Sequence, residues 1–216
     1  MTKQNIKSKE GFTIIEVVLV LAIAGLIFLM VFVALPALQR SQRDTQRRND
    51  LSRLGTALTQ WQTNHGTQVD SLPHPSGTAN SINWVGDGSF ATCNNDACYL
   101  VRDYMNTSAN GSTTTNTFVD PDGEYYNIVI SKNISDVASP AKLSSPQTSK
   151  AAAGAAELAW DATAKKYKLG GTDPYAAHTI FIVPGGTCDG DQIVKAEKRR
   201  YAVIYRLEGS GTYCMS

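Results

Sequence analysis

The sequence has little of what marks enzymes and nucleic-acid-binding proteins. Its 216 residues include three histidines, and 20 Lys and Arg balance 19 Asp and Glu, so the formal net charge is +1. A near-neutral balance does not favour a polyanionic partner, and the basic runs "QRRND" and "KAEKRRY" are too short to decide for nucleic acid. The histidines are isolated, and no nucleophile-elbow, phosphate-loop or zinc-protease motif occurs. We therefore expect that the protein is not an enzyme.

Charge is absent altogether from residues 17–35, a run long enough to cross the roughly 30 Å hydrocarbon core of a bilayer as a helix. The run is longer than the apolar region of a secretory signal, and its end lacks a small-residue cleavage site, so we expect it to be retained. Glu16 lies directly before it, where a carboxylate is costly without a partner. The sequence therefore predicts a membrane span with one acid at its start.

A second, amphipathic helical stretch follows the apolar run, because residues 39–62 contain no proline and a single glycine. Apolar residues recur there at spacings of three and four, which is the period of one helix face. They are Leu51, Leu54, Leu58 and Trp61. One helix is predicted from about residue 12 to about residue 63, with a kink or local melting at Pro36.

The arginine-rich segment "QRSQRDTQRRND" allows two interpretations. Its charges lie at helix-neighbour spacings that stabilise a solvent-facing surface, and this is the interpretation we favour. The pairs would be Arg40 with Asp44, Asp44 with Arg48, and Arg47 with Asp50. The alternative is contact with anionic lipid headgroups or with acids of neighbouring copies.

Beyond residue 66 the sequence predicts a small, loop-rich domain with three strand candidates. They are residues 124–131, 178–183 and 200–207, each rich in β-branched and aromatic residues and bounded by turn formers. In the last of them Tyr201 and Tyr205 would share one face. We expect three or four antiparallel strands packed on the amphipathic half of the helix.

The four cysteines all follow the apolar run. They are Cys93, Cys98, Cys188 and Cys214. An even number on one side of a membrane span indicates an oxidising, extracytoplasmic compartment and two disulfides, although the count leaves three connectivities open. A zinc site is not expected, since the cysteines lack both C-x-x-C spacing and a nearby histidine.

The segment "KEGFTIIEVVLVLAIAGLI" resembles the amino-terminal signature of type IV pilins and the related pseudopilins: a short basic leader, Gly, Phe, a Thr-containing apolar start, and Glu as the fifth residue from Phe12. The match is specific at its start and looser up to about His65. The resemblance implies cleavage between Gly11 and Phe12 by a prepilin peptidase, and methylation of the new Phe12 amine. It also implies that Phe12 and Glu16 take part in assembly, with the amine of one copy meeting Glu16 of a neighbour.

The resemblance implies an α+β, pilin-like lollipop fold with a small antiparallel sheet and a disulfide-tied C-terminal region. Its parts would be a leader at 1–11, a transmembrane and polymerisation half of the helix at 12–38, an amphipathic half at 39–65, and a β-rich head at 66–216. A C-terminal loop closed by Cys188 and Cys214 resembles the variable region of many pilins, which would leave Cys93 and Cys98 to close a small separate loop.

The implied partners are copies of the same chain in a helical filament, the peptidase, an inner-membrane assembly platform with its ATPase, and membrane lipid before assembly. The precursor would sit in the cytoplasmic membrane with its head outside the cytoplasm, and the assembled pilus would be extracellular, serving adhesion, motility or DNA uptake. A minor pilin or a type II secretion pseudopilin is the alternative within the family. An uncleaved, membrane-anchored extracytoplasmic binding module is the alternative of another class.

Two aspartate-rich stretches, "DPDGEYY" and "CDGDQ", raise the question of a calcium ion. The first is a turn sequence, and it also resembles the Asp-Pro-x-Gly-x-x-Tyr turn of major pseudopilins, some of which bind calcium. The candidate oxygen donors would be Asp120, Asp122, Asp189 or Asp191. Because no EF-hand spacing is present, we expect no required cofactor.

Overall fold

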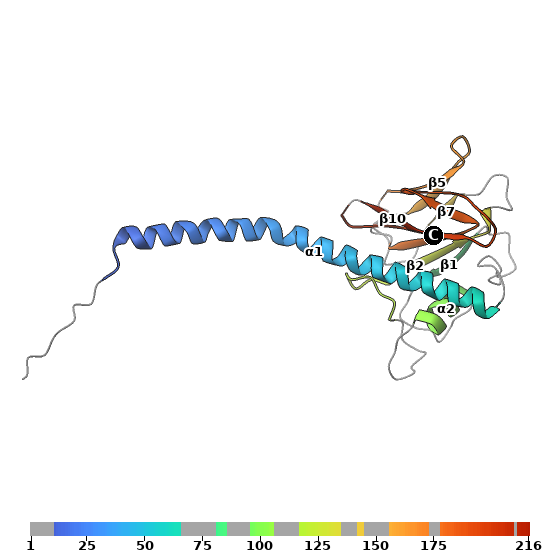
Figure 1. Ribbon diagram of the computed structural model, residues 1–216, viewed down its shortest axis with the longest axis horizontal. Coiled ribbons are helices and arrows are strands. Elements are labelled where there is room, and N and C mark those ends of the chain that lie inside the picture. The colour runs from blue at the N-terminus through green and yellow to red at the C-terminus, as the bar shows by residue number, and fades with distance from the viewer. Residues whose placement is uncertain are drawn as a thin grey trace, which may run out of the picture. The chain divides into compact units, whose positions relative to one another are not determined.

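The computed structural model describes residues 11–65, 81–85, 96–105, 117–134, 142–144, 156–172, 178–209 and 211–216 (Figure 1). The chain divides into two compact units, Met1–Ser41 and Gln42–Ser216. Helix α1, Ile14–His65, contributes to both. Its bounds confirm the predicted long helix, and its helical residues continue through Pro36 without the local melting that we expected.

The first unit consists of the apolar part of α1. Its large hydrophobic side chains are exposed, from Leu35 at 47% to Phe12 at 89%. The helix is long and apolar enough to cross a membrane, and none of its most apolar window is buried within the protein. This confirms a membrane-span candidate by length and composition.

The second unit combines the rest of α1 with two five-stranded sheets and two short helices. The short helices are α2, Asp96–Leu100, and the π-helix η2, Val101–Met105. The first sheet has the strand order β1-β2-β6-β9-β10, and the second has the order β3-β4-β5-β8-β7. The first comprises Ser81–Val85, Asn127–Ser131, Thr179–Pro184, Tyr201–Arg206 and Thr212–Met215 in that order. The second comprises Leu143–Ser144, Glu157–Asp161, Lys166–Gly170, Gln192–Lys195 and Gly186–Asp189.

The central strands of the first sheet, β2, β6 and β9, are buried on both faces. One face packs on the predicted leucine stripe of α1, and the other packs on the second sheet. Strand β9 shows the alternation: Val203 and Tyr205 lie in the cluster with the helix, whereas Ala202 and Ile204 lie in the cluster with the second sheet. The head thus has three layers, helix, sheet and sheet, where the sequence predicted two.

The three predicted strands correspond to β2, β6 and β9, and most strand pairs are antiparallel, as expected. One pair differs: β2 and β6 run parallel, with Asn127 opposite Thr179. Both strands therefore begin at the same end of the sheet, along the strand direction. In an antiparallel pair, the segments that precede the two strands would lie at opposite ends of the sheet.

A disulfide joins Cys188 on β7 to Cys214 on β10, with 5.8 Å between their Cα atoms. Strands β7 and β10 are edge strands of different sheets, so the bond holds the two sheets together at one side. This confirms the pairing that the pilin resemblance implied. Cys98 is also disulfide-bonded, and Cys93 lies outside the described residues.

Candidate functional site

The start of α1 is the first candidate site, because it holds the residues expected to take part in processing and assembly. Thr13 and Glu16 form a reciprocal capping arrangement: the backbone N–H and the hydroxyl of Thr13 each donate to Glu16 Oε2 at 2.8 Å, and the Glu16 N–H donates to Thr13 Oγ1 at 3.4 Å. Gly11 and Phe12 precede the helix and are exposed. The two expected assembly residues, Phe12 and Glu16, thus lie near each other at an accessible helix start.

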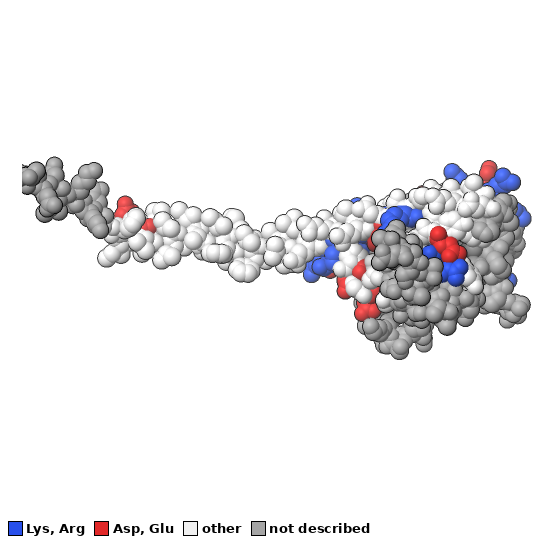
Figure 2. Space-filling model, turned by 90° about the horizontal axis from the view of Figure 1, so that it is seen from below, with Lys and Arg blue, Asp and Glu red and all other residues white. Residues whose placement is uncertain are grey.

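Glu16 is the only charge on this part of the helix. From Val17 to Gln39 no Asp, Glu, Lys or Arg follows, and Figure 2 shows the corresponding surface as continuous white between the charges at its two ends. The carboxylate uses Oε2 for the cap, whereas Oε1 accepts no hydrogen bond from the residues that the structure describes. That second oxygen can accept a donor from another molecule.

A second candidate site is a charged cluster in the head, which consists of Arg43, Asp44, Arg47, Asp120, Asp122, His178 and Glu208. Arg47 lies at its centre with a fully buried side chain. Its guanidinium binds Asp120 in a bidentate manner, with Nε–Oδ2 at 2.8 Å and NH2–Oδ1 at 2.7 Å. Its NH1 donates to Asp44 at 3.0 Å and to Glu208 at 3.2 Å. A buried cation therefore has several carboxylates around it, as burial of a charge requires.

The cluster ties α1 to the turn after β9. The Asp44 carboxylate accepts the backbone N–H groups of Glu208 at 3.0 Å and Gly209 at 2.9 Å. Arg43 binds Glu208 through Nε at 2.8 Å and NH2 at 2.5 Å, and this pairing lowers the pKa of the Glu208 carboxyl. Helix and turn thus hold each other through charge-assisted hydrogen bonds.

The predicted turn at residues 120–123 is confirmed, and it places the Asp120 carboxylate in contact with the Arg47 guanidinium. The N–H of Gly123 donates to the Asp120 carbonyl at 2.8 Å, and Gly123 has a φ of 96°, a conformation that favours glycine. The N–H of Asp122 donates to Asp120 Oδ1 at 3.1 Å. The turn therefore fixes a carboxylate whose side chain is completely buried.

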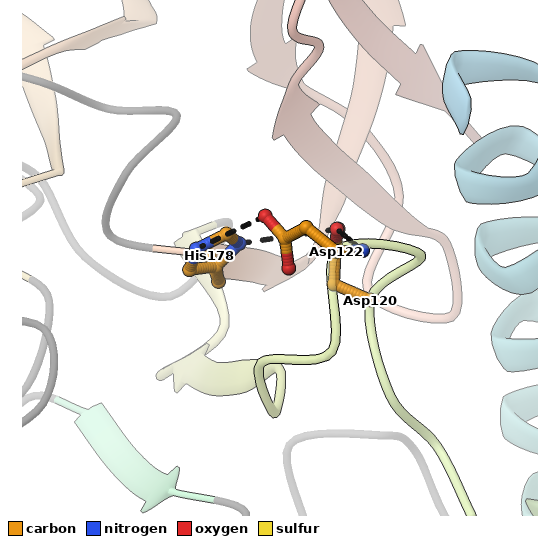
Figure 3. Close-up of side chains that lie close together, drawn as sticks. All are labelled: Asp120, Asp122 and His178. Carbon is orange, nitrogen blue, oxygen red and sulfur yellow. Dashed lines mark hydrogen bonds and ion pairs between the residues drawn. The ribbon is translucent and has the colours of Figure 1, made fainter. Parts of the chain in front are cut away.

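His178 joins this turn from the start of β6, as Figure 3 shows. Its Nε2 lies 3.6 Å from Asp122 Oδ2, and its Nδ1 lies 3.9 Å from Asp120 Oδ2. Burial alone would lower the pKa of His178, but the neighbouring carboxylates of Asp120 and Asp122 raise it. Burial would likewise raise the pKa of Asp120, but His178 and Arg47 hold it well below its usual range.

Asp120, Asp122 and His178 are also spaced as metal ligands are, with one donor atom of each within 4.8 Å of the others. Asp120, however, already accepts four hydrogen bonds: two from Arg47, one from the Asp122 N–H and one from the Tyr205 hydroxyl at 3.1 Å. A carboxylate has about four acceptor sites, so a cation would have to displace one of these donors and lie beside the buried guanidinium. The Asp120 carboxylate is therefore better suited to bind Arg47 than to bind a divalent ion.

The other calcium candidates lie elsewhere. Asp189 ends β7 and pairs with Lys166 at 2.6 Å, and Asp191 is exposed in the adjoining turn. Neither belongs to a metal-ligand group with Asp120 and Asp122 among the described residues. The four aspartates named from the sequence therefore do not form one site.

The solvent-facing interpretation of the arginine-rich segment is wrong for Arg47 and Asp44, which are buried. Arg47 pairs with Asp44 three residues earlier, and Asp50 pairs with Arg53 at 3.3 Å rather than with Arg47. The physical reason is that a long-range partner, Asp120, offers a bidentate buried contact that a helix neighbour cannot offer. Sequence spacing alone carries no signal of that partner.

His178 was also missed, since it is isolated in the sequence from the other histidines and from "DPDG". Parallel pairing of β2 and β6 is what brings the residues before the two strands together.

A scan against family models, a search of curated proteins and a search of solved structures each found no match to the chain.

Proposed function

We propose that the chain is a structural subunit of a type IV pilus-like filament that is cleaved between Gly11 and Phe12 and polymerises through the first part of α1. The observation that carries the proposal is the exposed apolar surface from Phe12 to Leu38, which begins with a single carboxylate. The sequence signature "GFTIIE" at the same place supports it. The partners would be copies of the chain, a prepilin peptidase and a membrane assembly platform with its ATPase.

The free energy of this apolar surface favours its burial, in a bilayer or against other helices, over its exposure to water. Nineteen large apolar side chains between Phe12 and Leu38 are exposed in the single chain. Burying one such side chain stabilises it by about 1.5–3 kcal/mol, so the segment as a whole would lose on the order of 30 kcal/mol or more in water. A bilayer can cover it before assembly, and the same segments of neighbouring copies can cover it afterwards.

Glu16 would set the register between copies. Cleavage leaves a positive amine on Phe12, and in a stack of parallel helices displaced along an axis that amine can meet Glu16 Oε1 of a neighbour. Two unit charges about 4 Å apart attract by around 4 kcal/mol at an effective dielectric of 20, and desolvation offsets much of this. The ion pair between the Phe12 amine and Glu16 would then fix the register of neighbouring copies more than it would strengthen their binding. Because the contact is head-to-tail, repetition generates a filament.

The first test is the intact mass and N-terminal sequence of the protein recovered from the surface of its native cells. We expect a chain that begins at Phe12 and carries one additional methyl group. A chain that begins at Met1, or one that is cut near Ala37, would contradict the proposal and leave an anchored or secreted binding module.

The second test replaces Glu16 by alanine in the full chain. The filament proposal expects loss of sheared surface fibres while the head keeps its Cys188–Cys214 disulfide. A membrane-anchored binding module predicts unchanged behaviour. Gln60→Ala, at an exposed position of α1 outside the apolar surface, is the control and should leave assembly unchanged.

A type II secretion pseudopilin is the second candidate, and one observation favours it. The stretch from Asp120 to Tyr126 follows the Asp-Pro-x-Gly-x-x-Tyr pattern and forms a tight turn in the structure. Abundance distinguishes the two: a major pilin dominates fibres that are sheared from the surface, whereas a pseudopilin or a minor pilin does not.

A further inference from the structure

Met215 on strand β10 packs against Gly55, the one glycine in the part of α1 that belongs to the head. The methionine side chain is half-buried, and a β-carbon at Gly55 would collide with its Cε methyl group. The sulfur atom lies 3.5 Å from the same β-carbon position. Because glycine has no β-carbon, the helix surface is open at this point and receives the end of the methionine side chain.

Strand β10 is an edge strand of the first sheet, and its side chains alternate between two attachments. Tyr213 and Met215 pack on the core cluster that α1 shares with this sheet, and the Arg48 guanidinium lies 5.8 Å from the centre of the Tyr213 ring. Cys214 packs on the cluster with the second sheet and forms the disulfide with Cys188. Met215 is therefore one of two β10 side chains that attach the strand to the helix side of the core.

The four methionines of the chain differ in their exposure. Met105 is 2% exposed in the core of the head, whereas Met215 is half-buried at the sheet edge. Met30 belongs to the apolar part of α1 that a membrane or neighbouring copies would cover, and Met1 lies outside the described residues. Of the two methionines in the head, Met215 is therefore the one that a small oxidant in water reaches more readily.

We propose that Met215 is an oxidation site, at which peroxide forms methionine sulfoxide and thereby loosens strand β10 from α1. The sulfur lone pair attacks one oxygen of hydrogen peroxide, the O–O bond breaks, and an S=O bond forms while the other oxygen leaves as water with both protons. The sulfur is oxidised by two electrons, and the peroxide is reduced. This site concerns the head alone and does not depend on the filament proposed above.

The contact at Gly55 offers no favourable place for the added oxygen. Tyr201 supplies the hydroxyl closest to the β-carbon position of Gly55, at 3.8 Å, and this hydroxyl already donates to the Gly55 carbonyl at 2.8 Å. A sulfoxide oxygen would either stay unpaired against the helix or take the hydroxyl from the carbonyl, and both cost free energy. The oxidised side chain avoids this cost by turning out into water, which removes its contact with α1. The disulfide of Cys214 still ties the strand to the second sheet, so the change is confined to β10.

Treatment of the full chain in detergent with hydrogen peroxide tests the proposal, with the added oxygen mapped by peptide mass spectrometry. Met215 should gain an oxygen about tenfold faster than Met105, because oxidation follows exposure. The backbone amides of β10 should then exchange hydrogen about tenfold faster than in the untreated chain, since local opening of the strand becomes easier. The amides of β4 in the second sheet should exchange as before.

Three variants identify the responsible side chain. Met215→Leu stays apolar at a similar volume but has no sulfur, so peroxide should leave the exchange of its β10 amides unchanged. Met215→Gln places a polar amide at the contact and should show the faster exchange without peroxide. Met105→Leu is the matched control, and it should respond to peroxide as the wild-type chain does.

Three results would overturn the proposal. The first is equal oxidation rates of Met215 and Met105 in the folded chain, which would mean that the sheet edge gives the oxidant no better access. The second is sulfoxide at Met215 with unchanged exchange of the β10 amides, which would mean that the contact tolerates the oxygen. The third is faster exchange in peroxide-treated Met215→Leu, which would assign the effect to another side chain. Faster exchange confined to chains with the sulfoxide or the glutamine, in which Cys188 and Cys214 remain bonded, supports the proposal.

Discussion

Arg47→Met isolates the contribution of the buried cation at the centre of the charged cluster. Methionine keeps an unbranched, flexible side chain that fills a similar space, but it leaves the Asp120 carboxylate buried without its bidentate partner. Removing one partner of a buried pair costs about 3–5 kcal/mol. Because domains of this size have a total stability of about 5–15 kcal/mol, we expect the variant to lose about a fifth of it or more.

The assay is urea and thermal unfolding of the full chain in detergent, followed by tryptophan fluorescence, since Trp61 is buried in the core between helix and sheet. A loss of 3–5 kcal/mol corresponds to a fall in Tm of about 6–20 °C for a protein of this size. Arg43→Met is the matched control: that side chain is 33% exposed and should contribute about 1 kcal/mol or less.

A second variant identifies the cause of the loss. Adding Asp120→Asn to Arg47→Met removes the uncompensated charge. The single amide oxygen still accepts the Asp122 N–H, and the amide NH2 that replaces the other oxygen can donate to the Tyr205 hydroxyl oxygen. We expect the double variant to be more stable than the sum of the two single losses predicts. The reasoning is refuted if Arg47→Met costs no more than Arg43→Met, or if the two losses simply add.

Three further outcomes are expected. Cys188→Ser with Cys214→Ser should lower the free energy of unfolding by about 3–4 kcal/mol, because their separation of 26 residues closes a long loop, and unfolding with and without reductant checks this. The raised pKa of His178 contributes stability that is present below its unfolded value of about 6.5 and is lost as pH rises through the folded pKa, so His178→Gln should flatten the fall in stability above pH 6.5. Leu54→Ala, in the core, should cost about 2–5 kcal/mol, whereas Leu29→Ala, which is 65% exposed in the single chain, should leave the unfolding of the head unchanged.

Features that depend on residues close in sequence were predicted well. The leucine stripe identified which face of α1 would be buried, and all four of its named residues lie in the core. The strand candidates were confirmed for the same reason, since an alternating or continuous apolar run is a local property. The sequence "DPDG" formed its turn, because proline and glycine set its backbone angles themselves.

The charged cluster could not be predicted in the same way, because its members come from four distant parts of the chain. Arg47 looks like any other arginine of a solvent-facing helix turn, and only its packing against the Asp120 turn buries it. The strands of the second sheet were also not predicted from the sequence. Its strands are short or carry charged residues on their outer face, so their apolar signal is weak.

By itself the sequence determined a helix of membrane length with one acid at its start, an amphipathic continuation, and a disulfide-bonded domain of strands. These follow from composition and from periodicity between neighbours. Only the tertiary structure decided that β2 and β6 run parallel, which places His178 beside Asp122, and that Arg47 is a buried counter-charge rather than a surface residue. Strand direction and burial depend on contacts between residues that are far apart in the chain, and no local pattern encodes these.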